Sequence, residues 1–167
     1  MSDIVIRQAL PDDRPSLQRM LELYQYELSD IWDQDLDSRG EFGYPLDRYF
    51  GESACCPFVA TVNARYAGFA LVDGAVKLSA SGYWMDQFFV MKKYRTQGLG
   101  RLMAQQVFGE LPGLWEVGQM SANLPAQRFW RKVIGEFTRG AFLEQTIDSD
   151  RWIGVVQSFD AQAKPRN

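Results

Sequence analysis

The feature that most constrains the fold is the segment 83–109, where an apolar strand pattern leads through a glycine loop into an apolar helix pattern. Residues 83–91 (YWMDQFFVM) are aromatic and apolar, which is typical of a buried strand. Gly98 and Gly100 then stand at the start of the helix, although glycine is a poor helix former. Glycine is favoured where the chain turns sharply or where another molecule approaches the backbone. The segment therefore predicts a strand, a tight loop and a helix N-terminus in succession.

The glycine loop also has the chemistry of an anion site. A helix N-terminus presents unpaired N–H groups and the positive end of the helix dipole, and phosphates bind there when the backbone is open. Arg95 and Arg101 add positive charge. No Walker motif is present, and Met103 stands where a dinucleotide fingerprint has its third glycine. A simple turn remains the alternative, but the Arg-x-x-Gly-x-Gly pattern between a strand and a helix predicts a pyrophosphate site.

The rest of the chain shows further strand and helix patterns of ordinary length. Alternation and helical spacing predict, in chain order, the strand 3–9, the helix 11–30, the short helix 45–51, the hairpin 57–72, the strand 83–91, the helix after Gly98, the strand 114–120, the helix 124–135 with Gly135 as its stop, and the strands 136–147 and 151–159. With 167 residues and 46% hydrophobic content, the chain is expected to form one domain over residues 1–160 with a frayed tail, 161–167.

Composition removes several classes of function. The chain has no histidine, which excludes Ser–His and Cys–His catalysis and most zinc sites, so no metal is expected. Any proton transfer must use carboxylates, tyrosine, lysine, water or the backbone. Cys55 and Cys56 are adjacent and form no disulfide framework, which fits a reducing cytoplasm. There is no signal-peptide pattern and no apolar run of the ~18 residues that a membrane span needs, so no membrane partner is expected.

The net charge of −3 is unevenly distributed, with one acidic and one basic region along the sequence. Residues 22–52 hold nine acidic residues against two basic ones, whereas residues 91–109 hold four basic residues and no acidic one. The acidic region suits a cationic ligand and the basic one an anion, unless both are simply solvated surface. Basic residues cluster only at the glycine loop, so nucleic-acid binding is not expected.

A second distinctive segment, 123–137 (NLPAQRFWRKVIGEF), follows the strand predicted after the glycine helix. Asn123 stands just before the first helical turn, and Ala126 and Trp130 share one face of the helix. An asparagine in this place also caps ordinary packed helices, so the segment alone does not define a function.

Together, the segments 85–103 and 123–137 resemble the GNAT superfamily of acyl-coenzyme A-dependent N-acyltransferases. The first is similar to that family's Arg/Gln-x-x-Gly-x-Gly/Ala loop after the fourth strand, and the second to its Asn-x-x-Ala motif with an aromatic pair. The predicted order of elements is similar over nearly the whole chain. The resemblance implies an α/β (α+β) fold with a mixed, mostly antiparallel sheet of about seven strands, whose parallel fourth and fifth strands splay apart. It also implies N-acetyltransferase activity with acetyl-coenzyme A as the acyl donor.

By this resemblance, the cofactor would lie along the fourth strand and the glycine loop. The loop whose backbone would hold the pyrophosphate comprises Arg95, Thr96, Gln97, Gly98, Leu99, Gly100 and Arg101. The strand edge that would pair with the pantetheine arm comprises Phe89, Val90 and Met91. Asn123 would face the same arm.

The group that would protonate the departing thiolate is left open. Many family members carry a tyrosine where Trp130 stands, and an indole N–H donates a hydrogen bond but gives up no proton near neutral pH. Either Tyr83, Tyr94 or water acts as the acid, or no acid is needed and Trp130 only donates a hydrogen bond.

The group that would take the proton of the amine is also left open, and two carboxylates are the candidates. Asp86 is the leading candidate, since strand alternation is expected to place it on the same face as Val90, four residues on. Glu116, on the next strand, is the second candidate. The alternative for Asp86 is a structural hydrogen-bond acceptor.

The amine acceptor is expected at the acidic region, because the first helices form the acceptor wall in this family's fold. Tyr24, Glu27 and Trp32, together with Asp86, are predicted to bind it. Carboxylates beside aromatic faces suit an ammonium group, so the acceptor is expected to be a small cationic amine. The aromatic residues can instead form core or a homodimer interface. A protein or peptide N-acetyltransferase and a non-catalytic acyl-coenzyme A-binding domain are the alternative functions.

Overall fold

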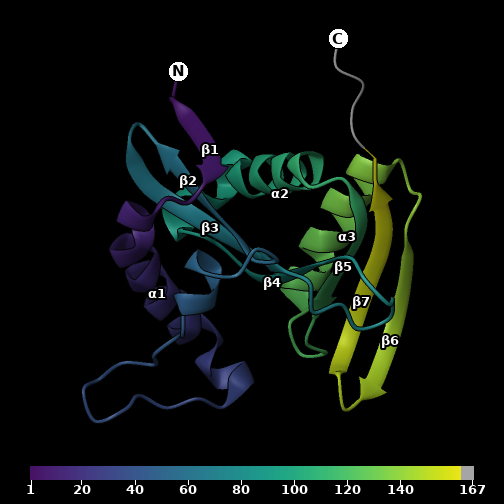
Figure 1. Ribbon diagram of the computed structural model, residues 1–167, viewed down its shortest axis with the longest axis horizontal. Helices are drawn as coiled ribbons and strands as arrows, with labels where there is room; N and C mark the ends of the chain where they lie inside the picture. The colour runs from purple at the N-terminus through teal and green to yellow at the C-terminus, as the bar shows by residue number, and fades with distance from the viewer. Residues whose placement is uncertain (163–167) are drawn as a thin grey trace.

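The structure is a computed structural model that describes residues 1–162, and it forms a seven-stranded sheet with helices on both faces (Figure 1). The strands are β1 (Ile4–Gln8), β2 (Cys56–Val62), β3 (Arg65–Asp73), β4 (Tyr83–Val90), β5 (Gly113–Gln119), β6 (Leu143–Ser149) and β7 (Trp152–Ala161). The helices are α1 (Arg14–Trp32), α2 (Leu99–Glu110) and α3 (Leu124–Thr138), with short 3₁₀ helices η1 (Pro11–Asp13), η2 (Asp47–Phe50) and η3 (Lys92–Gln97). The predicted order of elements is confirmed, with η2 as the second, short helix.

The sheet is mixed and mostly antiparallel, in the strand order β1-β2-β3-β4-β5-β7-β6. Only β4 and β5 run parallel, and they pair at two positions alone, Tyr83 with Trp115 and Trp84 with Glu116. Beyond these pairs the two strands diverge toward their carboxyl ends. The expected splay between the fourth and fifth strands is therefore confirmed.

Each face of the sheet carries its own hydrophobic core. On one face α1 packs Leu17 and Leu21 against Phe69 and Phe89, beside the β1–β3 half of the sheet in Figure 1. On the other face α2 and α3 enclose a larger core, which includes Phe58, Met103, Phe108, Trp115 and Ile134. Burying one such side chain stabilises the fold by about 1.5–3 kcal/mol, so both helical layers hold the sheet firmly around the splay.

Asp86 lies on the opposite face from the one that alternation predicts. The ladder between β3 and β4 pairs Leu71 with Gln87 but Val72 with Met85, so Asp86 is an extra residue in β4. Such a bulge interrupts strict alternation. Val90 packs in the core on the α2 face, whereas Asp86 bonds to a tyrosine, Tyr49, that packs in the core on the α1 face. The prediction that Asp86 and Val90 share a face is therefore wrong.

Helix α3 extends past the predicted stop at Gly135. It ends at Thr138, Arg139 adopts a left-handed conformation (φ of 54°), and the N–H of Gly140 donates to the carbonyl of Gly135. The extra turn buries Phe137 against Phe108, with 5.4 Å between ring centroids, and this packing favours helix over the predicted strand start at residue 136. Strand β6 begins at Leu143 instead.

The chain end differs from the prediction by one residue. Ala161 is fully buried and pairs with Gly113 as the last residue of β7, so it does not belong to the predicted tail. Residues 163–167 of that tail lie outside the described residues.

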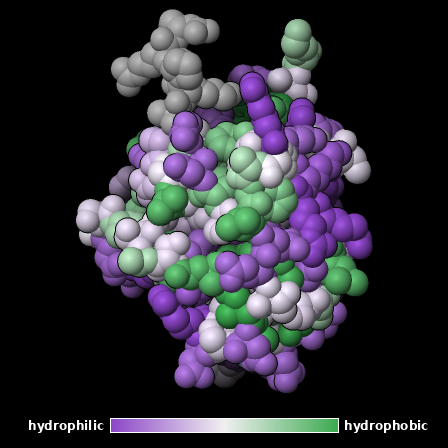
Figure 2. All heavy atoms as spheres, turned by 90° about the vertical axis from the view of Figure 1, so that its right-hand side faces the viewer, coloured by the Kyte–Doolittle hydropathy of each residue, from purple (hydrophilic) through white to green (hydrophobic). Residues whose placement is uncertain are grey.

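The outer side of the β6–β7 hairpin mixes apolar and polar residues (Figure 2). Leu143 and Ile153 are exposed on these strands. Within residues 1–162, no helix is both long enough and apolar enough to cross a membrane, and no acidic or cysteine side chains gather to hold a metal ion.

Candidate functional site

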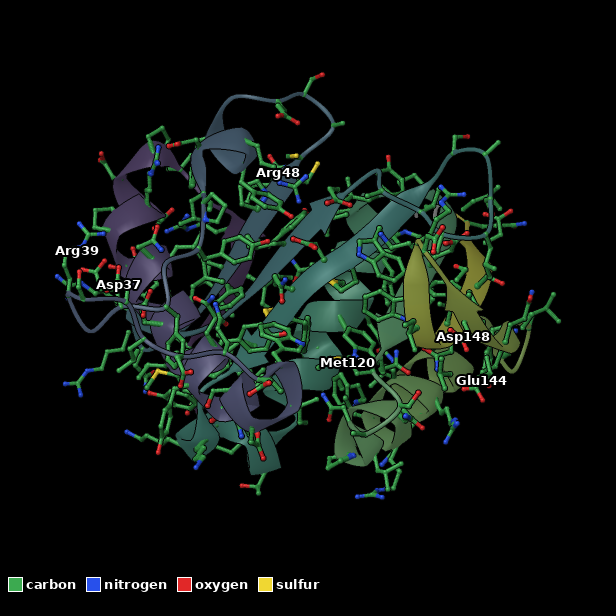
Figure 3. All side chains as sticks on the ribbon, turned by 90° about the horizontal axis from the view of Figure 1, so that it is seen from below. Asp37, Arg39, Arg48, Met120, Glu144 and Asp148 are labelled. Carbon is green, nitrogen blue, oxygen red and sulfur yellow. The ribbon has the colours of Figure 1, made fainter. Side chains whose placement is uncertain are left out.

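A cleft of about 1140 Å³ opens where β4 and β5 separate. It runs from α1 across the two strands to the N-terminal turns of α3 and the β6–β7 turn. Met120, at the end of β5, lines it and lies between the α1 half and the β6–β7 half of the molecule (Figure 3). Of the predicted site residues, those that line the cleft are Tyr24, Glu27, Trp32, Asp86, Phe89, Val90, Arg95, Gly98, Gly100, Arg101, Asn123 and Trp130. The splay thus brings the predicted acceptor residues and part of the predicted cofactor residues into one cleft.

The two glycines of the loop serve different purposes. Gly98 has a φ of 78° directly before α2, and a Cβ placed on it would meet no atom within 4 Å. Gly100 lies inside the helix, where a Cβ would come within 3.2 Å of the Phe129 ring. Open space at Gly98 therefore leaves the backbone accessible from the cleft, while Gly100 lets α3 pack closely. Three other predicted loop residues, Thr96, Gln97 and Leu99, do not line the cleft.

Arg95 joins the glycine loop to α1. Its Nε donates to the carbonyl of Val90 at 2.7 Å, and its Nη2 contacts both carboxylate oxygens of Glu27 at 2.7 and 2.6 Å. A residue predicted for the cofactor and one predicted for the acceptor are thus ion-paired across the cleft. Met91 lies outside the cleft, and its N–H donates to the carbonyl of Ala67.

The N-terminal half of α3 forms the opposite wall. Asn123 caps this helix, since its side-chain oxygen accepts the N–H of Ala126 at 3.3 Å. Trp130 is 5% exposed and lies edge-on to Phe88 and Phe129, with centroids 4.8 and 4.9 Å away. Among the described residues, none accepts a hydrogen bond from its indole N–H, so this donor is available to a ligand in the cleft.

The candidate acids Tyr94 and Tyr83 do not line the cleft. Tyr94 is buried in the core on the α2 face, and Tyr83 stacks on Trp115 at 5.2 Å between centroids.

Asp86 is held by three donors that come from a single segment, residues 44–49. Its Oδ2 accepts hydrogen bonds from the hydroxyl of Tyr44 and, at 2.6 Å, from that of Tyr49. Arg48 lies 3.4 Å from the same oxygen and pairs with Asp73 at 2.7 Å. Arg48 belongs to η2, and Figure 3 shows it beside the sheet. The Asp86 side chain is 19% exposed, so it remains reachable from the cleft.

The tyrosines around Asp86 are donors at neutral pH. Burial raises the pKa of Tyr24, Tyr44 and Tyr49, and the nearby charge of Asp86 raises each of them further. These phenols therefore stay protonated and stabilise a carboxylate beside them.

Glu116, the second candidate base, does not line the cleft. It is 1% exposed and accepts backbone N–H groups of Lys77, Leu78 and Ser79, the last at 2.7 Å. Burial alone would raise the pKa of Glu116, but these backbone hydrogen bonds outweigh burial and lower it. Glu116 therefore anchors the loop between β3 and β4 as a carboxylate.

Only one of the nine acids of residues 22–52 lines the cleft, and it is Glu27. Others stabilise the outer loop: Asp37 and Glu41 pair with Arg39, which lies far from the cleft (Figure 3), and Glu22 accepts two backbone N–H groups. Tyr24 and Trp32 form an edge-to-face pair at 5.6 Å beside Glu27. The end of the cleft predicted to bind the acceptor therefore combines aromatic walls with two carboxylates, Glu27 and Asp86.

The cleft therefore brings together a splayed parallel strand pair, a glycine loop at a helix N-terminus and an acidic end. The sequence pattern of the Acetyltransferase (GNAT) family matches residues 17–135. The chain belongs to this family and is an acyltransferase. No curated protein sequence matches the chain.

Solved structures share the fold across nearly the whole chain. The ribosomal-protein-S18-alanine N-acetyltransferase of Escherichia coli is 17% identical with a TM-score of 0.63, and the match covers 99% of this chain and 98% of that one. A Salmonella typhimurium protein solved with its cofactor acetyl-CoA is 15% identical, with a TM-score of 0.65 and coverage of 98% and 96%. An aminoglycoside acetyltransferase solved with coenzyme A is also 15% identical, with a TM-score of 0.63 and 95% of both chains covered. At these identities the likeness shows the fold alone.

Proposed function

We propose that the protein transfers the acetyl group of acetyl-coenzyme A to a small cationic primary amine, by direct attack within a ternary complex. The observation that carries this proposal is the single cleft, which joins the accessible backbone at Gly98 to the carboxylate of Asp86. Donor and acceptor can therefore meet without a covalent enzyme intermediate, and the described cleft contains no histidine or cysteine to form one.

The residues of the loop fit coenzyme A. The open space at Gly98 lets a ligand approach the start of α2, where a helix leaves N–H groups unpaired, and Arg101 lines the cleft beside it, which suits a pyrophosphate. The splayed half of β4 offers Phe89 and Val90 to the pantetheine arm, opposite Asn123. Similar folds solved with acetyl-CoA and with coenzyme A support this donor.

Acetyl-coenzyme A supplies a thioester, and the protein supplies the proton acceptor and the hydrogen-bond donor. An amine with a pKa near ~10 is protonated at pH 7 and must lose one proton before it attacks. Asp86 accepts this proton in our proposal. The amine nitrogen then bonds to the thioester carbonyl carbon, and the tetrahedral adduct gives its second surplus nitrogen proton to water. As the C–S bond breaks, the N–H of Trp130 donates a hydrogen bond to the departing sulfur, which leaves as a thiolate with a solution pKa near ~8.5 and takes a proton from water.

The residues at the proposed acceptor end suit a cation. Tyr24 and Trp32 present ring faces and edges beside Glu27, and a cation over an aromatic face gains about 0.5–2 kcal/mol. The free thiols Cys55 and Cys56 are stable in a reducing cytoplasm, where we propose that the enzyme acts.

Thiol release from acetyl-coenzyme A, measured with polyamines, aminoglycosides, amino acids and short peptides, tests the proposed function. We expect turnover with at least one small cationic amine. Turnover with peptides alone would show a protein-modifying role instead. Tight acetyl-coenzyme A binding without turnover of any amine would show a binding domain.

A further inference from the structure

We propose that Tyr44, Arg48 and Tyr49 are positioning residues that direct Asp86, so that its Oδ1 receives the ammonium group of the acceptor. This inference rests on the proposed function, because it assigns the acceptor's binding contact within that same cleft. It assigns a role to residues 44–49, a short segment outside the sheet that is separate from the glycine loop and α3. In this proposal the segment orients the reacting carboxylate.

The three donors converge on one oxygen of the carboxylate. The hydroxyls of Tyr44 and Tyr49 and the guanidinium of Arg48 all approach Oδ2. Arg48 also donates to the hydroxyl of Tyr49 at 3.0 Å, which leaves that hydroxyl's own hydrogen for Asp86. Within residues 1–162, no group donates a hydrogen bond to Oδ1. An ionised carboxylate accepts on both oxygens, so Oδ1 is the oxygen left for a ligand.

The bulge explains why Asp86 needs this support. Asp86 has no partner residue on β3, so the strand ladder alone does not fix its direction. The 44–49 segment does so because it is itself anchored on α1. Leu46 and Tyr49 are buried against Leu17 and Leu21, and Gln18 donates to the backbone carbonyl of Tyr44 at 3.1 Å.

The charge of the cluster favours a cation. Arg48 carries one positive charge against the two negative charges of Asp73 and Asp86, which leaves the cluster with one negative charge. Asp73 is 3% exposed and takes the shorter contact with Arg48, 2.7 Å against 3.4 Å for Asp86. The uncompensated charge therefore lies on Asp86, at the cleft. An ammonium group compensates it, whereas an anionic acceptor is repelled.

A double-mutant cycle between Tyr49→Phe and Asp86→Asn tests whether Tyr49 acts through Asp86. A hydrogen bond to a charged group predicts that Tyr49→Phe lowers kcat/KM for the amine by about tenfold or more in the wild-type background. In the Asp86→Asn background we expect no further loss. The KM for acetyl-coenzyme A should stay unchanged in all variants.

Tyr66→Phe is the matched control. Tyr66 donates to the carboxylate of Asp13 at 2.6 Å, the same length as the bond from Tyr49 to Asp86, but outside the cleft. We expect Tyr66→Phe to reduce stability without changing kcat/KM. Tyr44→Phe is the second positioning variant, should Tyr49→Phe not fold, and it is expected to repeat the pattern of Tyr49→Phe.

The outcomes distinguish a failure of the positioning role from a failure of the proposed function. If Tyr49→Phe lowers kcat/KM for the amine equally in the wild-type and the Asp86→Asn background, the positioning role is overturned while the proposed function stands. A Tyr49→Phe variant that raises the KM for acetyl-coenzyme A but leaves kcat/KM for the amine unchanged also overturns the positioning role. A folded wild type that transfers acetyl groups to no amine overturns the proposed function itself.

Discussion

The direction of the Asp86 side chain is set by residues that are distant in the sequence. Its donors lie 37–42 residues earlier in the chain, so their contact with it depends on the tertiary fold. Strand alternation could not show its direction, because the bulge is set by the register between β3 and β4. By contrast, the cap at Asn123 and the need for glycine at residue 98 are local, and the sequence predicts both.

The first prediction tests the proposed role of Asp86 as the base. We expect Asp86→Asn to lower kcat/KM at pH 7 by about 10²-fold or more, the usual contribution of a positioned base. Near pH 10 the amine loses its proton to solvent, so the loss should shrink to less than about tenfold. A pH profile of both proteins measures this. Equal losses at both pH values would exclude Asp86 as the base.

The second prediction concerns Trp130. In the proposed function the indole of Trp130 donates a hydrogen bond to the sulfur but no proton, so Trp130→Phe should slow kcat by about ten- to a hundredfold. Phe keeps most of the packing on Phe88. Single-turnover rates at saturating substrates give the comparison, and a loss beyond about a thousandfold would mean that Trp130 does more than donate a hydrogen bond.

At the scale of elements, helix starts were easier to predict than helix ends. A proline or asparagine marks the start of α3 in its own sequence, but its end at Thr138 depends on Phe137 packing against Phe108, about thirty residues away. The same holds for the acidic region. Its composition predicts one negatively charged wall, whereas in the structure Glu22, Asp37 and Glu41 make loop contacts and only Glu27 lines the cleft.

The loop before α2 gives the third prediction, with a control supplied by the chain itself. Gly98 and Gly140 both have left-handed φ angles, 78° and 81°, and a Cβ placed on either glycine would meet no atom within 4 Å. Valine at either position should cost a similar ~1–2 kcal/mol in unfolding free energy. Only Gly98→Val should abolish acetyl-coenzyme A binding, measured by calorimetry. Unchanged affinity in Gly98→Val would place the cofactor elsewhere.

At the scale of the whole molecule, one buried carboxylate outside the cleft connects β1, β3 and the start of α1. Asp13 accepts hydrogen bonds from Arg7 on β1 at 2.6 Å and from Tyr66 on β3 at 2.6 Å, directly before α1. Its hydrogen bonds, led by the one from Arg7, hold the pKa of Asp13 well below its ordinary value.

This gives the fourth prediction, on acid stability. A carboxyl whose pKa is lowered by folding stabilises the protein above its unfolded pKa of ~3.9, and this contribution is lost as the pH falls through and below that value. We therefore expect the urea midpoint of the wild type to drop steeply below about pH 5. Asp13→Asn should be less stable at pH 7 and should show a flatter pH dependence. A parallel profile for the two proteins would contradict this assignment.

The short pairing of β4 with β5 has a consequence for the empty enzyme. A sheet normally has two edges, but this one has two further edges inside it, because no residue of β4 beyond Trp84 pairs with β5. Unpaired strand edges invite other chains to add to them, which is a route to aggregation. A pantetheine arm along β4 would cover one of these edges, and a ligand at a hundred times its Kd adds about 2.7 kcal/mol of stability. The acyl donor would then also stabilise the fold. On heating, we expect the protein without coenzyme A to aggregate at a lower temperature than the protein with it.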